Sequence, residues 1–87
     1  MNTEKTINIY INNKKYYNLT KEKAKKIILS YKDLINDNFK DFAYYDYKTI
    51  IFNILDLFNN RATKITYNNN FGKRFLTMIL KNGGVLC

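Results

Sequence analysis

Residues 7–24 read INIYINNKKYYNLTKEKA, and within this stretch the pattern changes from that of a strand to that of a helix. Its isoleucines alternate with Asn and Tyr, which is the period of a strand with one buried face. The Asn12-Asn13 pair tolerates positive φ and predicts a two-residue turn. We therefore expect a β-hairpin over about residues 6–18.

The hairpin register follows from the turn. A two-residue loop places Ile9 opposite Tyr16 and Ile11 opposite Lys14, which leaves Tyr10 and Tyr17 on the other face. An isolated hairpin is marginally stable in water, so a helix must cover its isoleucine face.

Two helices with buried faces are predicted next. The first, over about residues 21–36, has Thr20 as a cap and Glu22 near its N-terminus. Its apolar residues recur at helical spacing: Ala24, Ile27, Ile28, Tyr31, Leu34 and Ile35. The second runs over about residues 47–60 and is the central core helix, because its apolar residues cover about 160° of its circumference. Residues 36–46 combine an Asn-rich break with dense aromatics and fit either helix or loop.

The C-terminal part is less regular. Residues 63–67 fit a loop or a short strand, and residues 68–70 a turn. Read as a strand, residues 73–81 would carry apolar groups on both faces, so a helix over about residues 71–82 fits better, with Gly83 after its C-terminus. The predicted fold is a single α+β domain in which an N-terminal β-hairpin packs on two or three helices.

The net charge of +8 is distributed unevenly along the chain. Residues 1–32 carry eight Lys and two Glu, a net charge of +6, and residues 61–87 carry five cations and no acid, a net charge of +5. Residues 33–60 between them carry five Asp and two Lys, a net charge of −3. Such segregation predicts a charged partner, either nucleic acid or a protein that itself binds it.

Three groups of side chains are candidate binding residues. The predicted last helix gathers Lys73, Arg74, Thr77 and Lys81 on one face. The first helix aligns Lys21, Lys25 and Lys32 in a row that either follows phosphates or is a solvated edge. Tyr44 and Tyr45 belong to an aromatic cluster that either anchors a partner or is partly core. Asp33, Asp37 and Asp41 would form an acidic stripe if the first helix continued.

Catalytic sites of the common kinds are excluded by composition. The chain has no His and a single Cys, at its last position, which removes the Ser-His-Asp and Cys-His arrangements and the usual zinc sites. Its three glycines form no phosphate-binding loop. We expect no enzymatic activity, no cofactor and no metal, and without a signal or spanning segment we expect a cytoplasmic protein with no membrane partner.

Two resemblances bear on function. Residues 7–29 resemble the hairpin-then-helix opening of many small phage and prophage proteins of AT-rich bacteria, some of which are anti-CRISPR or other anti-defence inhibitors. Residues 73–83, followed by Val85-Leu86, resemble the recognition helix of winged helix-turn-helix proteins. That likeness implies that Lys73, Arg74 and Thr77 face DNA, but residues 61–70 lack the preceding helix of the motif.

Two functions stay open on this basis. The first is a non-enzymatic, phage-encoded inhibitor that blocks a nucleic-acid-handling host defence protein such as a CRISPR effector. The alternative is a direct DNA- or RNA-binding protein, or a small transcriptional regulator, that uses the basic last helix.

Overall fold

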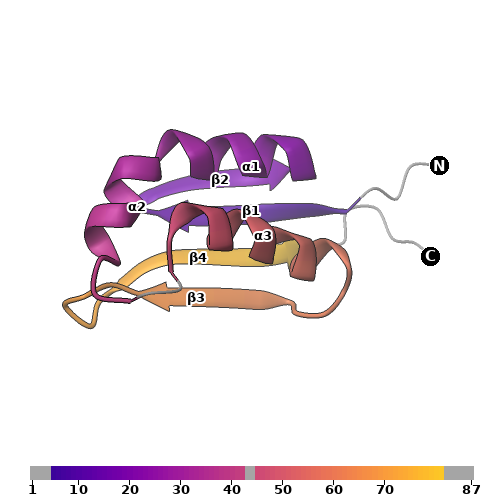
Figure 1. Cartoon of the computed structure of the whole chain (residues 1–87). Helices are drawn as coiled ribbons and strands as arrows, with labels where there is room; N and C mark the ends of the chain where they lie inside the picture. The colour runs from indigo at the N-terminus through magenta and orange to yellow at the C-terminus, as the bar shows by residue number, and fades with distance from the viewer. Residues whose placement is uncertain (1–4, 43–44, 82–87) are drawn as a thin grey trace.

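The computed structural model describes residues 5–42 and 45–81 as one antiparallel sheet with helices on one side (Figure 1). The strand order is β2-β1-β4-β3. In the chain the elements follow as β1 (Thr6–Ile11), β2 (Lys14–Leu19), α1 (Lys21–Ser30), α2 (Lys32–Asn38), α3 (Tyr47–Phe58), β3 (Lys64–Asn68) and β4 (Arg74–Lys81). The α+β class and the N-terminal hairpin followed by helices are confirmed.

The β1–β2 hairpin has the predicted turn and register. Ile9 pairs with Tyr16 and Ile11 with Lys14. Asn12 and Asn13 have φ of 51° and 66°, as a two-residue hairpin turn requires. Farther along, β2 contains an extra residue, and Asn18 there adopts a φ of 57°. This bulge directs Leu19 into the core.

The first predicted helix is divided in two. Thr20 caps α1 by accepting a hydrogen bond from the Lys23 N–H at 3.3 Å, as expected. The helix ends at Tyr31, whose hydroxyl lies 2.7 Å from that of Tyr16, and α2 begins at the next residue. The prediction of one continuous helix over residues 21–36 is therefore wrong at Tyr31, although the buried positions Ala24, Ile28 and Ile35 are those expected.

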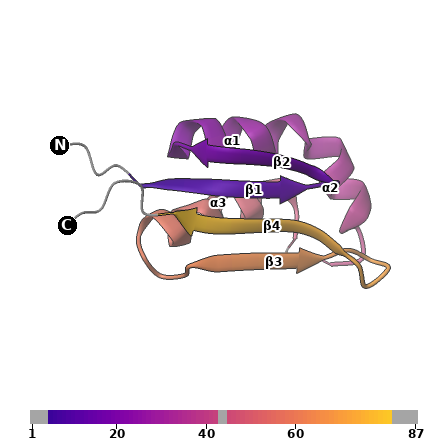
Figure 2. The same ribbon diagram turned by 180° about the vertical axis from the view of Figure 1, so that it is seen from behind.

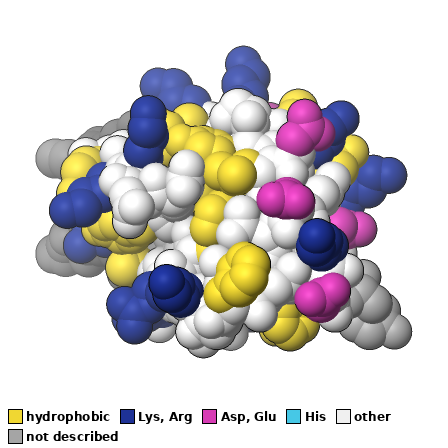
Figure 3. All heavy atoms as spheres, turned by 90° about the vertical axis from the view of Figure 1, so that its left-hand side faces the viewer, with side chains coloured by type: hydrophobic (Ala, Val, Ile, Leu, Met, Phe, Trp, Pro, Cys, Tyr) yellow, Lys and Arg dark blue, Asp and Glu magenta, His cyan; other side chains and the backbone are white. Residues whose placement is uncertain are grey.

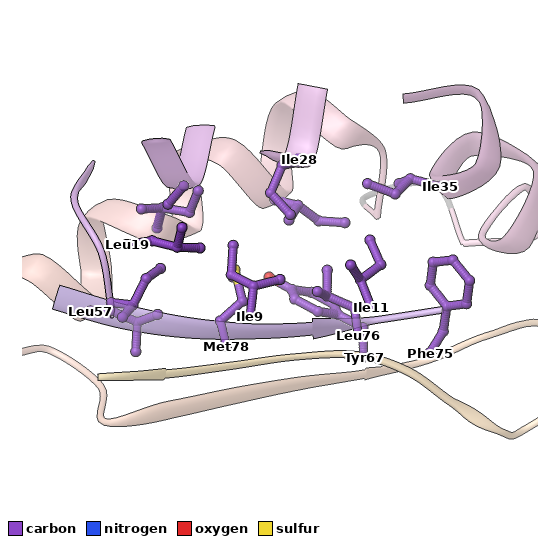
Figure 4. Close-up of a cluster of buried hydrophobic side chains, with 14 of the residues drawn as sticks. Ile9, Ile11, Leu19, Ile28, Ile35, Leu57, Tyr67, Phe75, Leu76 and Met78 are labelled. Atoms are coloured by element: carbon purple, nitrogen blue, oxygen red, sulfur yellow. The ribbon is translucent and has the colours of Figure 1, made fainter. Parts of the chain in front are cut away.

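Helix α3 begins where the sequence predicts. The Asp46 side chain accepts a hydrogen bond from the Thr49 N–H at 2.8 Å and caps the helix. Ile50, Ile54 and Leu57 are fully buried. Figure 4 shows the core between the helices and the sheet, with isoleucines of β1 and Leu76 and Met78 of β4 beneath Ile28 and Ile35.

The predicted C-terminal helix over residues 71–82 is wrong. Residues 74–81 form β4, a central strand that pairs with β1 and β3, and residue 82 lies outside the described residues together with Gly83. The structure explains why residues 73–81 carry apolar side chains that do not alternate as in a regular strand. Leu76, Met78 and Leu80 face the helices, and a bulge opposite residues 67–68 of β3 also directs Phe75 inward onto Phe39, at a ring-centroid distance of 5.5 Å. A recognition helix of the winged helix-turn-helix kind is therefore not formed here.

Within residues 5–42 and 45–81, no helix is both long and apolar enough to cross a membrane.

Candidate functional site

The helices cover only one face of the sheet, and Figure 2 shows that none of the helices of residues 5–42 and 45–81 lies over the other face. Strand pairing identifies the side chains there, because residues opposite each other on antiparallel strands point to the same side. One such row runs across all four strands through Lys15, Tyr10, Thr77 and Thr66. The hydroxyls of Thr66 and Thr77 lie 3.3 Å apart and confirm this orientation. We call this surface the open face.

Two tyrosines give the open face an aromatic patch. The rings of Tyr10 and Tyr17 meet edge to face, with centroids 6.0 Å apart and planes at 82°. The Tyr17 side chain is 55% exposed. Behind it, Asn8 Oδ1 accepts a hydrogen bond from the Asn18 N–H at 3.0 Å and stabilises the bulge. An aromatic ring is thus presented to solvent on a fixed backbone.

Four cations surround this patch, and the strands contain no acid. Lys15 and Arg74 lie at the turn end of the open face, while Lys64 and Lys81 lie in or beyond the next row toward the other end. All four are exposed. The one ion pair among the described residues joins Arg61 to Asp56 at 3.8 Å, so it involves none of these cations.

The acidic residues lie elsewhere. Of the seven in the chain, Glu4 is outside the described residues, and the other six belong to the helices or to the segments that precede and follow them. In Figure 3, which views the turn end of the sheet, the acidic side chains lie in the right half of the surface. The left half carries Lys and Arg without acid. The described acids are therefore confined to the helix side of the molecule, whereas cations occur on both sides.

A depression of about 200 Å³ lies at the turn end of the open face. Its walls come from the hairpin and from the start of β4. They are formed by Tyr10, Asn13, Lys14, Lys15, Arg74, Phe75 and Thr77. Three of these residues are cations and none is an acid, so the lining carries a net positive charge.

In the β3–β4 loop beside this depression, the Asn69 side chain makes three hydrogen bonds. Asn69 Oδ1 accepts hydrogen bonds from the N–H groups of Phe71 and Lys73, both at 3.0 Å. Its Nδ2 donates to Asn38 Oδ1 at 3.1 Å and ties the loop to the end of α2. The loop presents Phe71, which is 79% exposed, next to Lys73 and Arg74.

The predicted grouping of Lys73, Arg74, Thr77 and Lys81 on a helix face is wrong. Lys73 precedes β4, Arg74 begins it and Lys81 ends it, so Arg74 and Lys81 are separated by about 23 Å of extended chain. Thr77, only 6% exposed, lies between them. The structure brings Arg74 and Thr77 together with Tyr10 and Lys15, a combination that the helical interpretation did not contain.

The predicted row of Lys21, Lys25 and Lys32 lies in the helix layer and not on the open face. Lys21 and Lys25 belong to α1, which packs over β1 and β2. Lys32 follows the break at Tyr31, and its Nζ lies 5.6 Å from the centroid of the Tyr47 ring. The row is therefore interrupted, and it lies on a different surface from the cations of the sheet.

The aromatic cluster is partly core, which is one of the two alternatives that the sequence left open. Tyr44 lies outside the described residues. Tyr45 stacks on Phe42 at 5.4 Å and also contacts the buried rings of Phe39 and Tyr67 edge to face, at 5.8 and 5.2 Å. Only its outer part is available to a partner.

Sequence reasoning missed Lys14, Lys15, Tyr10 and Tyr17 as site residues. The signal was available, because the hairpin alternation already placed Tyr10 and Tyr17 opposite the core face. What was lacking was the second half of the sheet, since only β4 brings Arg74 and Thr77 beside Tyr10.

The shifted pKa values belong to structural side chains. Burial raises the pKa of Tyr67, partly offset by the hydrogen bond from Asn53. The hydrogen bond with Tyr16 raises the pKa of Tyr31 to about 12. Hydrogen bonds from Thr49 lower the pKa of the Asp46 carboxyl. Each shift thus accompanies a hydrogen bond that holds a core side chain or a helix end, and none lies on the open face.

The open face therefore offers exposed cations and aromatic rings, a chemistry that suits binding of an anion with planar groups. No protein-family model, no curated protein and no solved structure matches this chain.

Proposed function

We propose that the protein is a non-enzymatic module that binds single-stranded nucleic acid on the open face. The observation that carries this proposal is the combination of Tyr10 and Tyr17 with four exposed cations and no acid on one uncovered sheet surface. Cations neutralise phosphates, and aromatic rings stack on bases of any sequence.

The shape of the open face favours an unpaired strand. An α-helix or a protruding ribbon is the usual reader of the major groove, but here the helices pack against the opposite face of the sheet. A four-stranded sheet about 14 Å wide suits bases that are turned toward it and stacked on tyrosine. RNA-recognition modules use the same chemistry on four-stranded sheets, which is an analogy of chemistry and not of family.

The number of cations sets the expected salt dependence. If Lys15, Lys64, Arg74 and Lys81 each neutralise one phosphate, log K should fall against log salt with a slope of about −3, since each phosphate contributes about −0.7 for a single strand. Affinity should then fall about 50-fold between 50 and 200 mM salt.

The test is binding of a fluorescent single-stranded oligonucleotide across this salt range. The variant Lys15→Glu/Arg74→Glu should weaken binding and halve the slope at least. The matched control Lys21→Glu/Lys25→Glu changes the net charge equally but on α1, and should leave the slope unchanged. Equal loss in both variants, or no binding of the wild type at 50 mM salt, would refute the proposal.

A second candidate function is inhibition of a nucleic-acid-handling protein, of the anti-CRISPR or other anti-defence type. The observation in its favour is that Asp33 and Asp37 are exposed one turn apart on α2, and that the exposed Asp41, Phe42 and Tyr45 follow this helix, a combination that suits the basic groove of such a partner. In that case Asp37→Lys and Phe42→Ala would abolish inhibition of the target nuclease, and Lys15→Glu/Arg74→Glu would not.

A further inference from the structure

The depression at the turn end differs from the rest of the open face in shape and in charge. It lies where the β1–β2 turn and the start of β4 come together, and the Asn12 N–H donates a hydrogen bond to the Phe75 carbonyl there at 3.2 Å. A strand bound along the open face would meet this depression at one end of the sheet. The position of the depression therefore suits the terminal nucleotide of such a strand.

Its charge exceeds what an internal phosphate needs. Lys14, Lys15 and Arg74 line one cavity without an acid, whereas a phosphodiester carries a single negative charge. A phosphate monoester carries a charge of about −1.5 to −2 near neutral pH and offers three acceptor oxygens. The guanidinium of Arg74 can bind two of these oxygens at once, and Lys15, which pairs with Tyr10, binds as a point charge.

The depression is large enough for a phosphate group but not for a whole nucleotide. The volume of about 200 Å³ is below the roughly 300–1,000 Å³ of cavities that enclose a drug-sized ligand. A phosphate with part of its sugar fits this volume. The attached base would remain outside, on the open face, where Tyr17 is exposed.

The walls of the depression are held in place before any ligand binds. The tight turn at Asn12-Asn13 fixes the hairpin side, and its hydrogen bond to Phe75 joins it to β4. On the other side Asn69 holds the N–H of Lys73, the residue before Arg74. Little ordering of the backbone is then needed on binding, which favours affinity.

We infer that this depression is a subsite for the terminal phosphate monoester of a bound nucleic-acid strand. The inference rests on the proposed function and deepens it, because it makes the module selective for strand ends that carry a phosphate. Arg74 and Lys15 hold the phosphate, and Tyr10 flanks the adjoining sugar.

The experiment compares oligonucleotides of one sequence with a 5′-phosphate, a 3′-phosphate or no phosphate, at one salt concentration. One phosphorylated form should bind about tenfold tighter than the unphosphorylated form, the size expected for added charge-assisted hydrogen bonds. Arg74→Gln should remove this preference, and Lys15→Gln should reduce it. Lys81→Gln, at the far end of the same strand, should weaken all three oligonucleotides equally and keep the preference.

Competition by adenosine monophosphate and by inorganic phosphate tests the ligand class. The nucleotide should displace the phosphorylated oligonucleotide at a lower concentration than inorganic phosphate does, and equal competition would overturn the assignment to a nucleotide terminus. Equal binding of all three oligonucleotides would overturn the subsite and leave the proposed function intact. Arg74-dependent binding of the nucleotide without any oligonucleotide binding would support the subsite and overturn the proposed function. No binding of either would overturn both.

Discussion

Replacement of Asn69 by alanine should loosen the β3–β4 loop and destabilise the whole domain. The substitution removes three side-chain hydrogen bonds, two from the N–H groups of Phe71 and Lys73 and one to Asn38. A net hydrogen bond contributes about 0.5–1.5 kcal/mol, and the two exposed N–H groups can bond to water instead, so each counts at the lower limit. With about 1 kcal/mol for the partly buried Asn38 bond, the expected loss is about 2 kcal/mol.

The assay is urea unfolding followed by circular dichroism, with a thermal scan beside it. A loss of about 2 kcal/mol corresponds to a fall in Tm of roughly 8–16 °C for a domain of this size. The adjacent Asn70→Ala is the matched control, because the Asn70 side chain accepts one exposed hydrogen bond, from the Asp41 N–H at 3.3 Å, and its loss should cost about 0.5 kcal/mol or less. An Asn69→Ala protein within 0.5 kcal/mol of wild type, or an Asn70→Ala protein that is equally unstable, would refute the assigned role of Asn69.

Three further changes test the packing and the titrating groups. Tyr16→Phe removes the hydroxyl that bonds to Tyr31, so the Tyr31 pKa should return from about 12 toward its ordinary value of 10 in a tyrosinate absorbance titration. In the wild type, the stability that this hydrogen bond contributes is fully present below pH 10 and is lost as the pH rises toward 12. This pH-dependent loss should be smaller in the variant. Asp46→Ala should lower the free energy of unfolding by about 1 kcal/mol through loss of the helix cap. Because the Asp46 pKa is lowered from 3.8 in the folded state, the stability that its carboxylate contributes is present above that pH and should be lost on acidification. Asp46→Asn should abolish this pH-dependent loss in unfolding curves measured against pH. Ile54→Ala, at a fully buried position, should cost about 2–5 kcal/mol in urea unfolding, whereas Phe52→Ala on the same helix, 65% exposed, should cost about 0.5 kcal/mol or less, and similar losses in both would contradict the core assignment.

The fold places the acidic and basic segments of the chain in different parts of the molecule. The acidic middle of the sequence folds into α2, α3 and their connections, while Lys15, Lys64, Arg74 and Lys81 lie on the open face. A polyanion on the open face would therefore lie on the opposite side of the sheet from the helices, which carry most of the Asp side chains. The acidic middle is then no obstacle to binding a polyanion, although it interrupts the basic residues along the chain.

Local interactions determined the hairpin and α3. Alternating isoleucines, a turn of two Asn residues and the Asp46 cap each act within a few residues of chain, so the sequence predicts their type, register and starting points. The position of Tyr10 and Tyr17 opposite the core was also predictable, since alternation alone sets it.

Tertiary structure decided residues 74–81 and, with them, the site. A central strand has both edges paired, and here a bulge also turns two successive apolar residues to the core, so its sequence matches the pattern of a helix as well as that of a strand. The pairing that selects the strand comes from β1, more than sixty residues earlier in the chain. Local sequence does not specify a partner so distant. The sequence could therefore place Tyr10 on the face opposite the core, but it could not predict that Tyr10 and Lys15 lie beside Arg74 and Thr77.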